Sequence, residues 1–144
     1  MKQLTKQLNQ QVANFGVLYT KLHYFHWFVE GPQFKQLHEF FEALYDETTN
    51  HLDAVAERLL MLGEKPLATL KEFLEFASIK EASGKFTGTE MLEQTMNDFK
   101  MVDKEIKETI KVAQGLEDEV TVDLLIGIAA SLQKHIWFIN ASLK

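Results

Sequence analysis

Apolar residues recur every three or four positions along two long stretches in the first half of the chain. The first stretch covers about residues 3–28, and its apolar positions are Leu4, Leu8, Val12, Phe15, Leu18, Leu22 and Phe25. The second covers about residues 34–62, with Phe34, Leu37, Phe41, Leu44, Leu52, Val55, Leu59 and Leu62. This spacing predicts two long amphipathic helices. The Gly31-Pro32 dipeptide between them predicts a short break, so the two helices should be antiparallel neighbours.

A longer connection separates this first half from two further apolar stretches. The connection covers residues 64–88, and LATLKEFLEFA (67–77) within it predicts one short amphipathic helix. A third long helix is predicted over about residues 89–113, with Leu92, Met96, Phe99, Val102, Ile106 and Ile110. A fourth is predicted over about residues 119–142, with Leu125, Ala129, Leu132, Ile136, Ile139 and Leu143.

Residues that favour helix ends stand at the expected boundaries. Thr87, followed three residues later by Glu90, predicts a capping box at the start of the third long helix. Gly63, with Pro66 beyond it, predicts the end of the second long helix, and Gly115 predicts the end of the third. The chain has only 7 Gly and 2 Pro, so few other breaks are available.

The lengths of the connections predict how the four long helices are arranged. The long link lets the chain cross the bundle before the last two helices form a second hairpin, which is the connectivity of ferritin-like bundles. The predicted fold class is therefore all-α: a single ferritin-like four-helix bundle over residues 1–144, with one long crossover that contains a short helix. A plain up-down bundle is the alternative.

Composition limits the chemistry that the chain can carry. An apolar fraction of 46% indicates a globular protein, and 144 residues suffice for one domain with a substantial core. The absence of cysteine excludes disulfides, thiolate zinc sites and cysteine nucleophiles, so any metal must be bound by imidazole and carboxylate. The N-terminus lacks the apolar run of a signal peptide, and no stretch approaches the roughly 18 apolar residues of a membrane span. A cytoplasmic protein without membrane contact is expected.

The charge balance bears on nucleic-acid binding. The formal net charge is −6, from 21 acidic and 15 basic residues. An acidic surface repels nucleic acid unless a basic patch or tail offsets the repulsion. The termini offer only Lys2, Lys6 and Lys144. Binding to DNA is therefore expected to be weak or absent.

One face of the second long helix is polar and separate from its apolar stripe. Four ionisable residues of this helix fall within an arc of roughly 100°, centred roughly 130° from the stripe; they are His38, Glu42, Asp53 and Glu57. The first two are one turn apart and can share a metal, and so can the last two. The two pairs, however, are roughly 16 Å apart along the helix, which is too far for ligands of one metal centre.

The two pairs can meet if this helix packs antiparallel against the same helix of a second subunit. Such an isologous contact would have its two-fold axis near residues 47–48 and would form two sites per dimer. His26 would join the first pair, because the short link between the helices places it near His38. Acidic residues on an exposed helix face are ordinarily solvated charges, and spacing alone leaves that alternative open.

The remaining histidines receive a different interpretation. A di-iron site inside the bundle would need Glu-x-x-His pairs, and no histidine of this chain has Glu three residues before it. An intrasubunit site of that type is therefore not expected. His23, His51 and His135 are predicted to be packing or surface residues.

The spacing of several motifs resembles that of one known family. The string FHWFVEGPQFKQLHEFFEALYDETTNHLDAVAERLLMLGEKP (25–66) resembles the signature region of Dps-family mini-ferritins. The similarity continues through TLKEFLE (69–75) and VTVDLLIGIAASLQKHIWFI (120–139). Its H-W, L-H-E-x-x-[DE] and D-x-x-A-E-R elements, at these intervals, are highly specific, and they favour a metal site over solvated charges.

This resemblance implies a hollow homododecameric shell with ferroxidase sites at its dimer interfaces. His26, His38 and Glu42 would come from one subunit, and Asp53 and Glu57 from its partner. Many relatives have Asp where this chain has Glu42, and the longer side chain would shift the geometry or affinity of the second, weaker metal position.

The resemblance also implies roles for residues outside that ligand set. Trp27 matches a tryptophan that lies near the site in the family. Asp123 matches an acidic residue that lines the three-fold pores through which iron enters, and Asp118 and Glu119 would add charge there.

The implied function is iron storage and detoxification by a ferroxidase. Fe²⁺ would enter through acidic pores, be oxidised with hydrogen peroxide and be stored as ferric mineral, which protects against oxidative stress. Two alternatives stay open. One is a nucleoid-condensing, DNA-binding shell in which metal binding is secondary. The other is a shell that binds Zn²⁺ or Mn²⁺ structurally, since both metals compete for this donor set.

Overall fold

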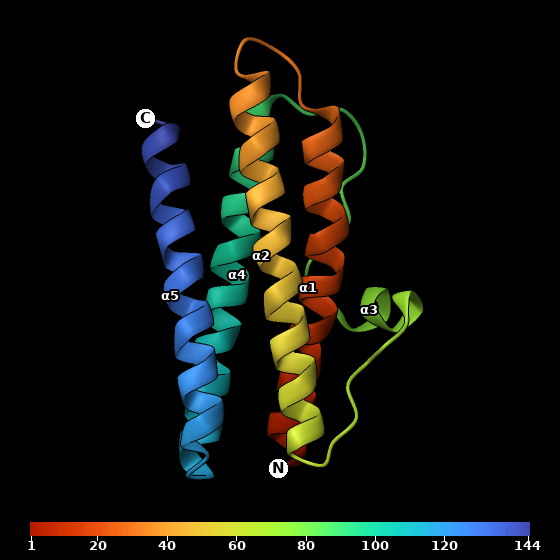
Figure 1. Cartoon of the computed structure of the whole chain (residues 1–144), viewed down its shortest axis with the longest axis vertical. Coiled ribbons are helices and arrows are strands. Elements are labelled where there is room, and N and C mark those ends of the chain that lie inside the picture. The colour runs from red at the N-terminus through yellow and green to blue at the C-terminus, as the bar shows by residue number, and fades with distance from the viewer.

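Four long helices and one short helix make up the chain, and the computed structural model describes all 144 residues. The elements are α1 (Lys2–Phe28), α2 (Phe34–Met61), α3 (Leu70–Phe76), α4 (Gly88–Gly115) and α5 (Glu119–Ser142). The α1–α2 and α4–α5 pairs are antiparallel hairpins, whereas α2 and α4 run in the same direction and the connection between them returns along the bundle (Figure 1). The predicted all-α, ferritin-like connectivity is confirmed. The plain up-down bundle is excluded, because it would make α2 and α4 antiparallel.

Two capping boxes set the starts of α4 and α3. The predicted box of Thr87 and Glu90 is confirmed: the Thr87 side chain accepts from the Glu90 N–H, and the Glu90 side chain accepts from the Thr87 N–H. Thr69 and Glu72 form a second box, which the sequence reading missed. Because an N-cap residue has extended rather than helical backbone, α3 begins at Leu70 and not at 67 as predicted.

The left-handed residue at the end of α4 is not the predicted glycine. The helix runs through Gly115, and the residue in the left-handed conformation is Glu117, with φ of 58°. The next N–H, that of Asp118, then bonds to the carbonyl of Ala113 at 3.0 Å, as in a Schellman motif. The end of α2 uses glycine for the same purpose, since Gly63 has φ of 80°.

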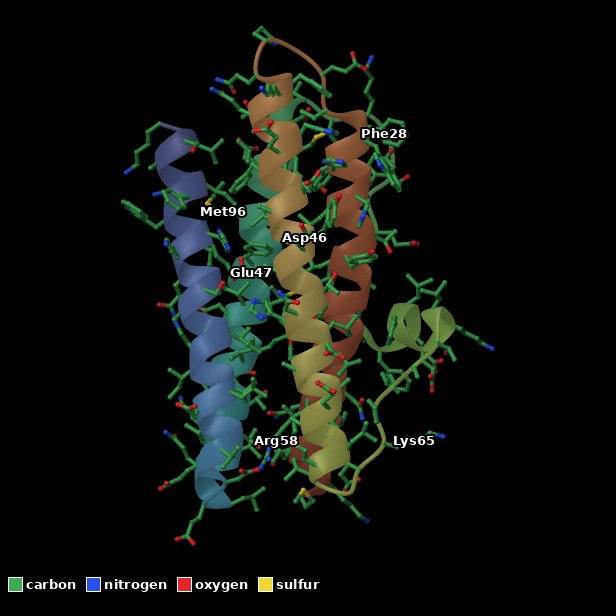
Figure 2. The ribbon with its side chains drawn as sticks, viewed as in Figure 1. Phe28, Asp46, Glu47, Arg58, Lys65 and Met96 are labelled. Carbon is green, nitrogen blue, oxygen red and sulfur yellow. The ribbon has the colours of Figure 1, made fainter.

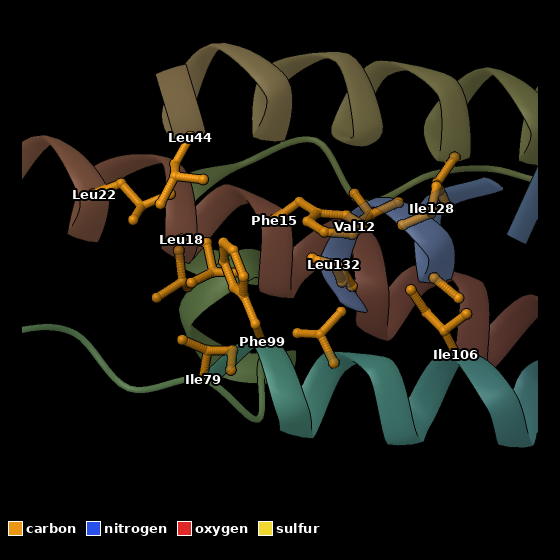
Figure 3. Close-up of a cluster of buried hydrophobic side chains, with 14 of the residues drawn as sticks. Val12, Phe15, Leu18, Leu22, Leu44, Ile79, Phe99, Ile106, Ile128 and Leu132 are labelled. Atoms are coloured by element: carbon orange, nitrogen blue, oxygen red, sulfur yellow. The ribbon is translucent and has the colours of Figure 1, made fainter. Parts of the chain in front are cut away.

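The hydrophobic core runs along the middle of the four long helices. It comprises 25 buried apolar residues, and the largest fully buried side chains include Phe15, Phe25, Phe41 and Phe99. Figure 3 shows how side chains from α1, α2, α4 and α5 meet there, and how Ile79 of the crossover adds to them. Burial on this scale is what orders the helices, because helices of this kind owe most of their stability to packing of an apolar face.

The crossover is fixed to the bundle by two contacts with α1. Asn14 is fully buried; its Oδ1 accepts from the Ser78 N–H at 2.8 Å, and its Nδ2 donates to Glu105 of α4 at 2.9 Å. Farther along α1, Phe73 of α3 lies directly against Gly16, where any Cβ would overlap the phenyl ring. The crossover is therefore held by buried hydrogen bonds and by a glycine that lets α3 approach α1 closely.

A buried ion pair links α1 to α4. Lys21 Nζ lies 2.7 Å from Asp98 Oδ2, and the two side chains are only 6% and 15% exposed. Burial raises the pKa of Asp98 above its ordinary value, although the hydrogen bond and the charge of Lys21 act in the opposite direction. Each charge therefore depends on the other for its compensation.

Helix α5 is more apolar than the sequence reading allowed. By length and composition it could cross a membrane, with a mean hydropathy of 1.3 over its most apolar window. This corrects the expectation that no segment comes near that limit. In the chain α5 is a bundle helix, with Leu125 and Leu132 in the core and Trp137 and Phe138 on its exposed side. Its apolarity arises because it has apolar residues on both its buried and its exposed faces.

Candidate metal centre

His26, near the end of α1, and His38, in the second turn of α2, lie face to face. Their ring centroids are 3.6 Å apart and the rings are nearly parallel, with an interplanar angle of 14°. Each ring places its Nδ1 against the backbone carbonyl of the other residue, at 2.7 Å for His26 and 2.8 Å for His38. A carbonyl oxygen only accepts, so both Nδ1 atoms donate, and in the neutral imidazole this tautomer leaves the lone pair of Nε2 free. This is the arrangement in which histidine binds metals.

Glu42 completes a cluster of three potential ligands. Its carboxylate lies one helical turn after His38 and 3.9 Å from the Nε2 of His26. The three ligand atoms all lie within 4.8 Å of one another, and this is the one group of at least three histidines or acidic residues in the chain with that property. His26 is buried, His38 is half-buried and Glu42 is exposed, so the cluster opens toward solvent on the carboxylate side.

The other two predicted ligands lie farther along α2, on its solvent face. Asp53 and Glu57 are both exposed, and neither makes an ion pair within the chain. The helix between Glu42 and Asp53 is roughly 16 Å long, so these carboxylates do not reach the histidine cluster of their own chain. One chain thus brings three of the five predicted ligands together and holds the other two apart.

Aromatic rings surround the histidine cluster. Phe34 stacks on His38 at 4.9 Å, and Tyr45 meets His26 edge-on at 5.3 Å. Partial burial, with the charges of Glu42 and Asp46, raises the pKa of Tyr45 above its ordinary value. The apolar spacing of α2 places Phe34 in the buried stripe, whereas its side chain is 43% exposed and packs against His38, a predicted ligand.

The chain is similar to known proteins over nearly its whole length. Residues 5–144 match the Ferritin-like domain family. The chain is 51% identical over 142 residues to DNA protection during starvation protein 2 of Bacillus anthracis, covering 99% of this chain and 97% of that one. Its fold superposes on Dps from Staphylococcus aureus with a TM-score of 0.98 and 42% identity, covering 100% and 97% of the two chains. The chain belongs to the Dps proteins of the ferritin-like family.

Two further relatives add context for this Dps chain. It is 46% identical to General stress protein 20U of Bacillus subtilis over 142 residues, covering 99% of this chain and 98% of the relative. It also resembles Dps from Listeria innocua, whose crystals were soaked with zinc, with a TM-score of 0.94 and 42% identity over 97% of this chain and 95% of that one.

Trp27 and His23 lie beside the cluster in this Dps chain and do not join it. His23 stacks on Tyr45 at 3.7 Å and donates from Nδ1 to the carbonyl of Tyr19. Trp27 contacts His23 at 5.2 Å between ring centroids, and its side chain is 64% exposed. His23 therefore packs against the aromatic residues, as predicted, and Trp27 faces outward next to His26.

The last two histidines form a polar cluster between α2 and α5 that the sequence reading did not foresee. Glu47, labelled in Figure 2, bonds to His135 Nε2 at 2.5 Å and lies 3.5 Å from His51 Nε2. Burial lowers the pKa of His51 and favours its neutral form, although Glu47 acts in the opposite direction. The i, i+4 spacing of Glu47 and His51 was visible in the sequence, but their partner on α5 is 88 residues from Glu47 and no local pattern indicates it.

The predicted pore residues lie at the start of α5. Asp118 is the N-cap of this helix, and its carboxylate lies 3.0 Å from the guanidinium of Arg58 of α2. Arg58 is labelled in Figure 2. Burial alone would raise the pKa of Asp118, but hydrogen bonds from Thr121 and the charge of Arg58 outweigh it and hold the pKa below its ordinary value. Glu119 and Asp123 are exposed and make no ion pair. The predicted ligands thus belong to the α1–α2 hairpin, and the predicted pore residues to the α4–α5 hairpin.

Proposed function

We propose that this Dps chain oxidises and stores iron, at a site that is completed by a second copy of the chain. The observation that carries the proposal is that three of the five predicted ligands lie together in one chain and the other two lie apart from them. His26, His38 and Glu42 form a preorganised half-site with two free Nε2 atoms. Asp53 and Glu57 are exposed carboxylates without a partner in their own chain. A nitrogen and oxygen donor set of this kind suits ferrous iron.

A two-fold dimer brings the two halves together. If α2 packs antiparallel against α2 of a second subunit, with the axis near residues 47–48, Glu42 of one chain lies opposite the partner's Asp53. The same operation places His38 opposite the partner's Glu57. The dimer then holds two equivalent sites, each with two imidazoles and three carboxylates. A homododecamer of such dimers would enclose the hollow in which mineral is stored.

The chemistry proposed for the site is a two-electron reduction of hydrogen peroxide. Two Fe²⁺ ions give up one electron each, the O–O bond breaks, and two protons are taken up to release two water molecules. Because both electrons arrive together, no hydroxyl radical is released, as it would be from a single Fe²⁺. The ferric ions then hydrolyse and are stored as mineral. Zn²⁺ and Mn²⁺ fit the same donors and would compete for them.

Entry of iron is proposed to occur at an acidic pore near the start of α5. Glu119 and Asp123 would attract Fe²⁺ by focused negative potential. Asp118 contributes less, because Arg58 already compensates its charge. The protein is proposed to act in the cytoplasm, as a defence against iron and peroxide.

Anaerobic loading with Fe²⁺, followed by peroxide, tests the proposed function. We expect about one peroxide to be consumed per two Fe²⁺, with rising ferric absorbance and no radical detected by a spin trap. Native mass spectrometry of the same sample should give a dodecamer. A stable monomer, a 24-mer, or a shell that binds Zn²⁺ and leaves Fe²⁺ unoxidised would contradict the proposal.

DNA packing is the second candidate function, and one surface feature favours it. Four exposed lysines follow one face of α4; they are Lys100, Lys104, Lys107 and Lys111. Relatives carry DNA protection in their names. Against this stand the net charge of −6 and the ion pair of Lys107 with Asp103.

We expect no retardation of linear DNA near neutral pH at moderate salt without divalent cations, because the net repulsion outweighs this short row. Gel electrophoresis across a salt series measures it. The control replaces the four α4 lysines with glutamine and should abolish any retardation that appears at low salt. Strong retardation at moderate salt would make DNA packing the better reading.

A further inference from the structure

Phe34 is a large apolar residue that lies largely outside the hydrophobic core. It is the first residue of α2, its N–H bonds to the carbonyl of Gly31 at 3.0 Å, and its side chain is 43% exposed. Its nearest aromatic partner is His38, one turn later, with ring centroids 4.9 Å apart and an interplanar angle of 25°. An exposed phenyl ring at this position contributes little to the core but covers a predicted metal ligand.

His38 is thereby the shared member of a three-ring stack. It stacks on His26 at 3.6 Å and on Phe34 at 4.9 Å. The orientation of the His38 ring determines both of its uses. In the present orientation Nδ1 donates to the carbonyl of His26 and leaves Nε2 free as a ligand. Rotation of the ring about χ2 would break that hydrogen bond and turn Nε2 away, and stacked rings oppose such rotation.

Stacking also becomes more favourable when a metal binds. An imidazole that donates its Nε2 lone pair to a divalent cation becomes electron-poor, and the face of a phenyl ring is electron-rich. The contact between Phe34 and His38 is therefore stronger in the metal-bound state than in the empty state. An interaction with that difference raises metal affinity, whereas one of equal strength in both states does not.

We propose that Phe34 is a positioning residue of the metal centre, which holds the His38 ring so that its Nε2 faces the metal. It acts through His38 and does not touch the metal itself. The inference rests on the proposed site, and it adds that the histidine half of this site is ordered within one chain before the partner's carboxylates arrive.

Binding of Zn²⁺ to the metal-free assembled protein tests this inference without depending on iron oxidation. Phe34→Leu keeps apolar volume and removes the aromatic face, so we expect the affinity for the first Zn²⁺ to fall by about three- to tenfold in calorimetric titrations. Phe34→Tyr keeps the aromatic face and should bind within about twofold of the unmodified protein. In iron oxidation, Phe34→Leu should raise KM for Fe²⁺ and leave kcat nearly unchanged.

Phe138→Leu is the matched control. Phe138 is 45% exposed, close to the exposure of Phe34, and its stacking partner is Trp137 rather than a histidine. It should leave Zn²⁺ affinity unchanged. If Phe34→Leu dissociates the shell, Phe34→Gln provides a second non-aromatic variant, and native mass spectrometry identifies the assembled samples.

The inference is overturned if assembled Phe34→Leu or Phe34→Gln binds Zn²⁺ as tightly as the unmodified protein. It is also overturned if Phe138→Leu weakens binding equally, or if Phe34→Tyr binds as weakly as Phe34→Leu. Failure of the proposed function looks different. In that case the unmodified protein binds Zn²⁺ with the expected dependence on Phe34 but does not oxidise Fe²⁺ with peroxide.

Discussion

Shells assembled from Asp53→Ala chains and His38→Ala chains together are expected to oxidise iron that neither variant oxidises alone. Each variant alone loses one ligand from every site, because all subunits carry the same change. A site in the mixed shell is complete when its histidine side comes from an Asp53→Ala chain and its carboxylate side from a His38→Ala chain. With equal amounts and random association, about one quarter of the sites meet this condition.

The experiment requires co-assembly from unfolded chains, and peroxide-dependent Fe²⁺ oxidation is the measurement. The matched control mixes Asp53→Ala with Glu57→Ala. Both ligands lie on the same side of the site, so no combination of those two chains restores a full set, and no recovery is expected. Recovery in this control, or none in the first mixture although native mass spectrometry detects mixed dimers, would show that the ligands are not divided between two chains as proposed.

Loss of the Lys21–Asp98 pair is expected to have the largest effect on stability. Lys21→Met leaves Asp98 buried without a counter-charge and should cost about 3–5 kcal/mol. The double variant Lys21→Met/Asp98→Leu replaces both charges with apolar groups and should recover most of that loss. Chemical unfolding provides the measurement. The pair of Lys107 and Asp103 is the control. The Lys107 side chain is 57% exposed, and Asp103 also accepts a hydrogen bond from Gln133. Asp103 therefore keeps a polar partner without Lys107, and Lys107→Met should cost only about 1 kcal/mol.

The same pair predicts a pH dependence with a definite sign. Burial raises the pKa of Asp98 in the folded chain above its ordinary value. A group of this kind contributes stability at low pH, where it is protonated in both states, and that contribution is lost as the pH rises through the raised pKa. Lys21→Met removes the one influence that lowers this pKa, so its destabilisation should be larger near pH 7 than near pH 4. An equal loss at both pH values would mean that Asp98 does not titrate with folding.

Local patterns were sufficient to predict the helices and their connectivity. The spacing of apolar residues located all four long helices, because each helix must bury one apolar face. Glycine, proline and capping residues then located most of the helix ends. The boundary of α3 was missed because its Thr69 cap lies inside a stretch that looks helical by composition. The left-handed end of α4 at Glu117 could not be foreseen, since that conformation usually selects glycine.

Side-chain contacts between distant elements were less accessible. His26 could be placed near His38 because a short link joins their helices, but the hydrogen bonds that join each ring to the other residue's backbone required coordinates. The hydrogen bond between Glu47 and His135 joins residues 88 positions apart, and no local sequence pattern predicts it. Phe34 was assigned to the apolar stripe because its residue type fits the helical spacing. Its exposure depends on what the neighbouring helices cover, which the spacing does not show.

The separation of the two hairpins has a consequence for how such proteins can diverge. Every proposed ligand lies between His26 and Glu57, in the first hairpin, whereas the proposed entry residues begin at Asp118, in the second. If the proposed roles hold, substitutions in the second hairpin would change the entry of iron and leave all five proposed ligands in place. The proposed oxidation step and the proposed supply step therefore depend on different helices, so either half of the chain could change in sequence while the other half is kept.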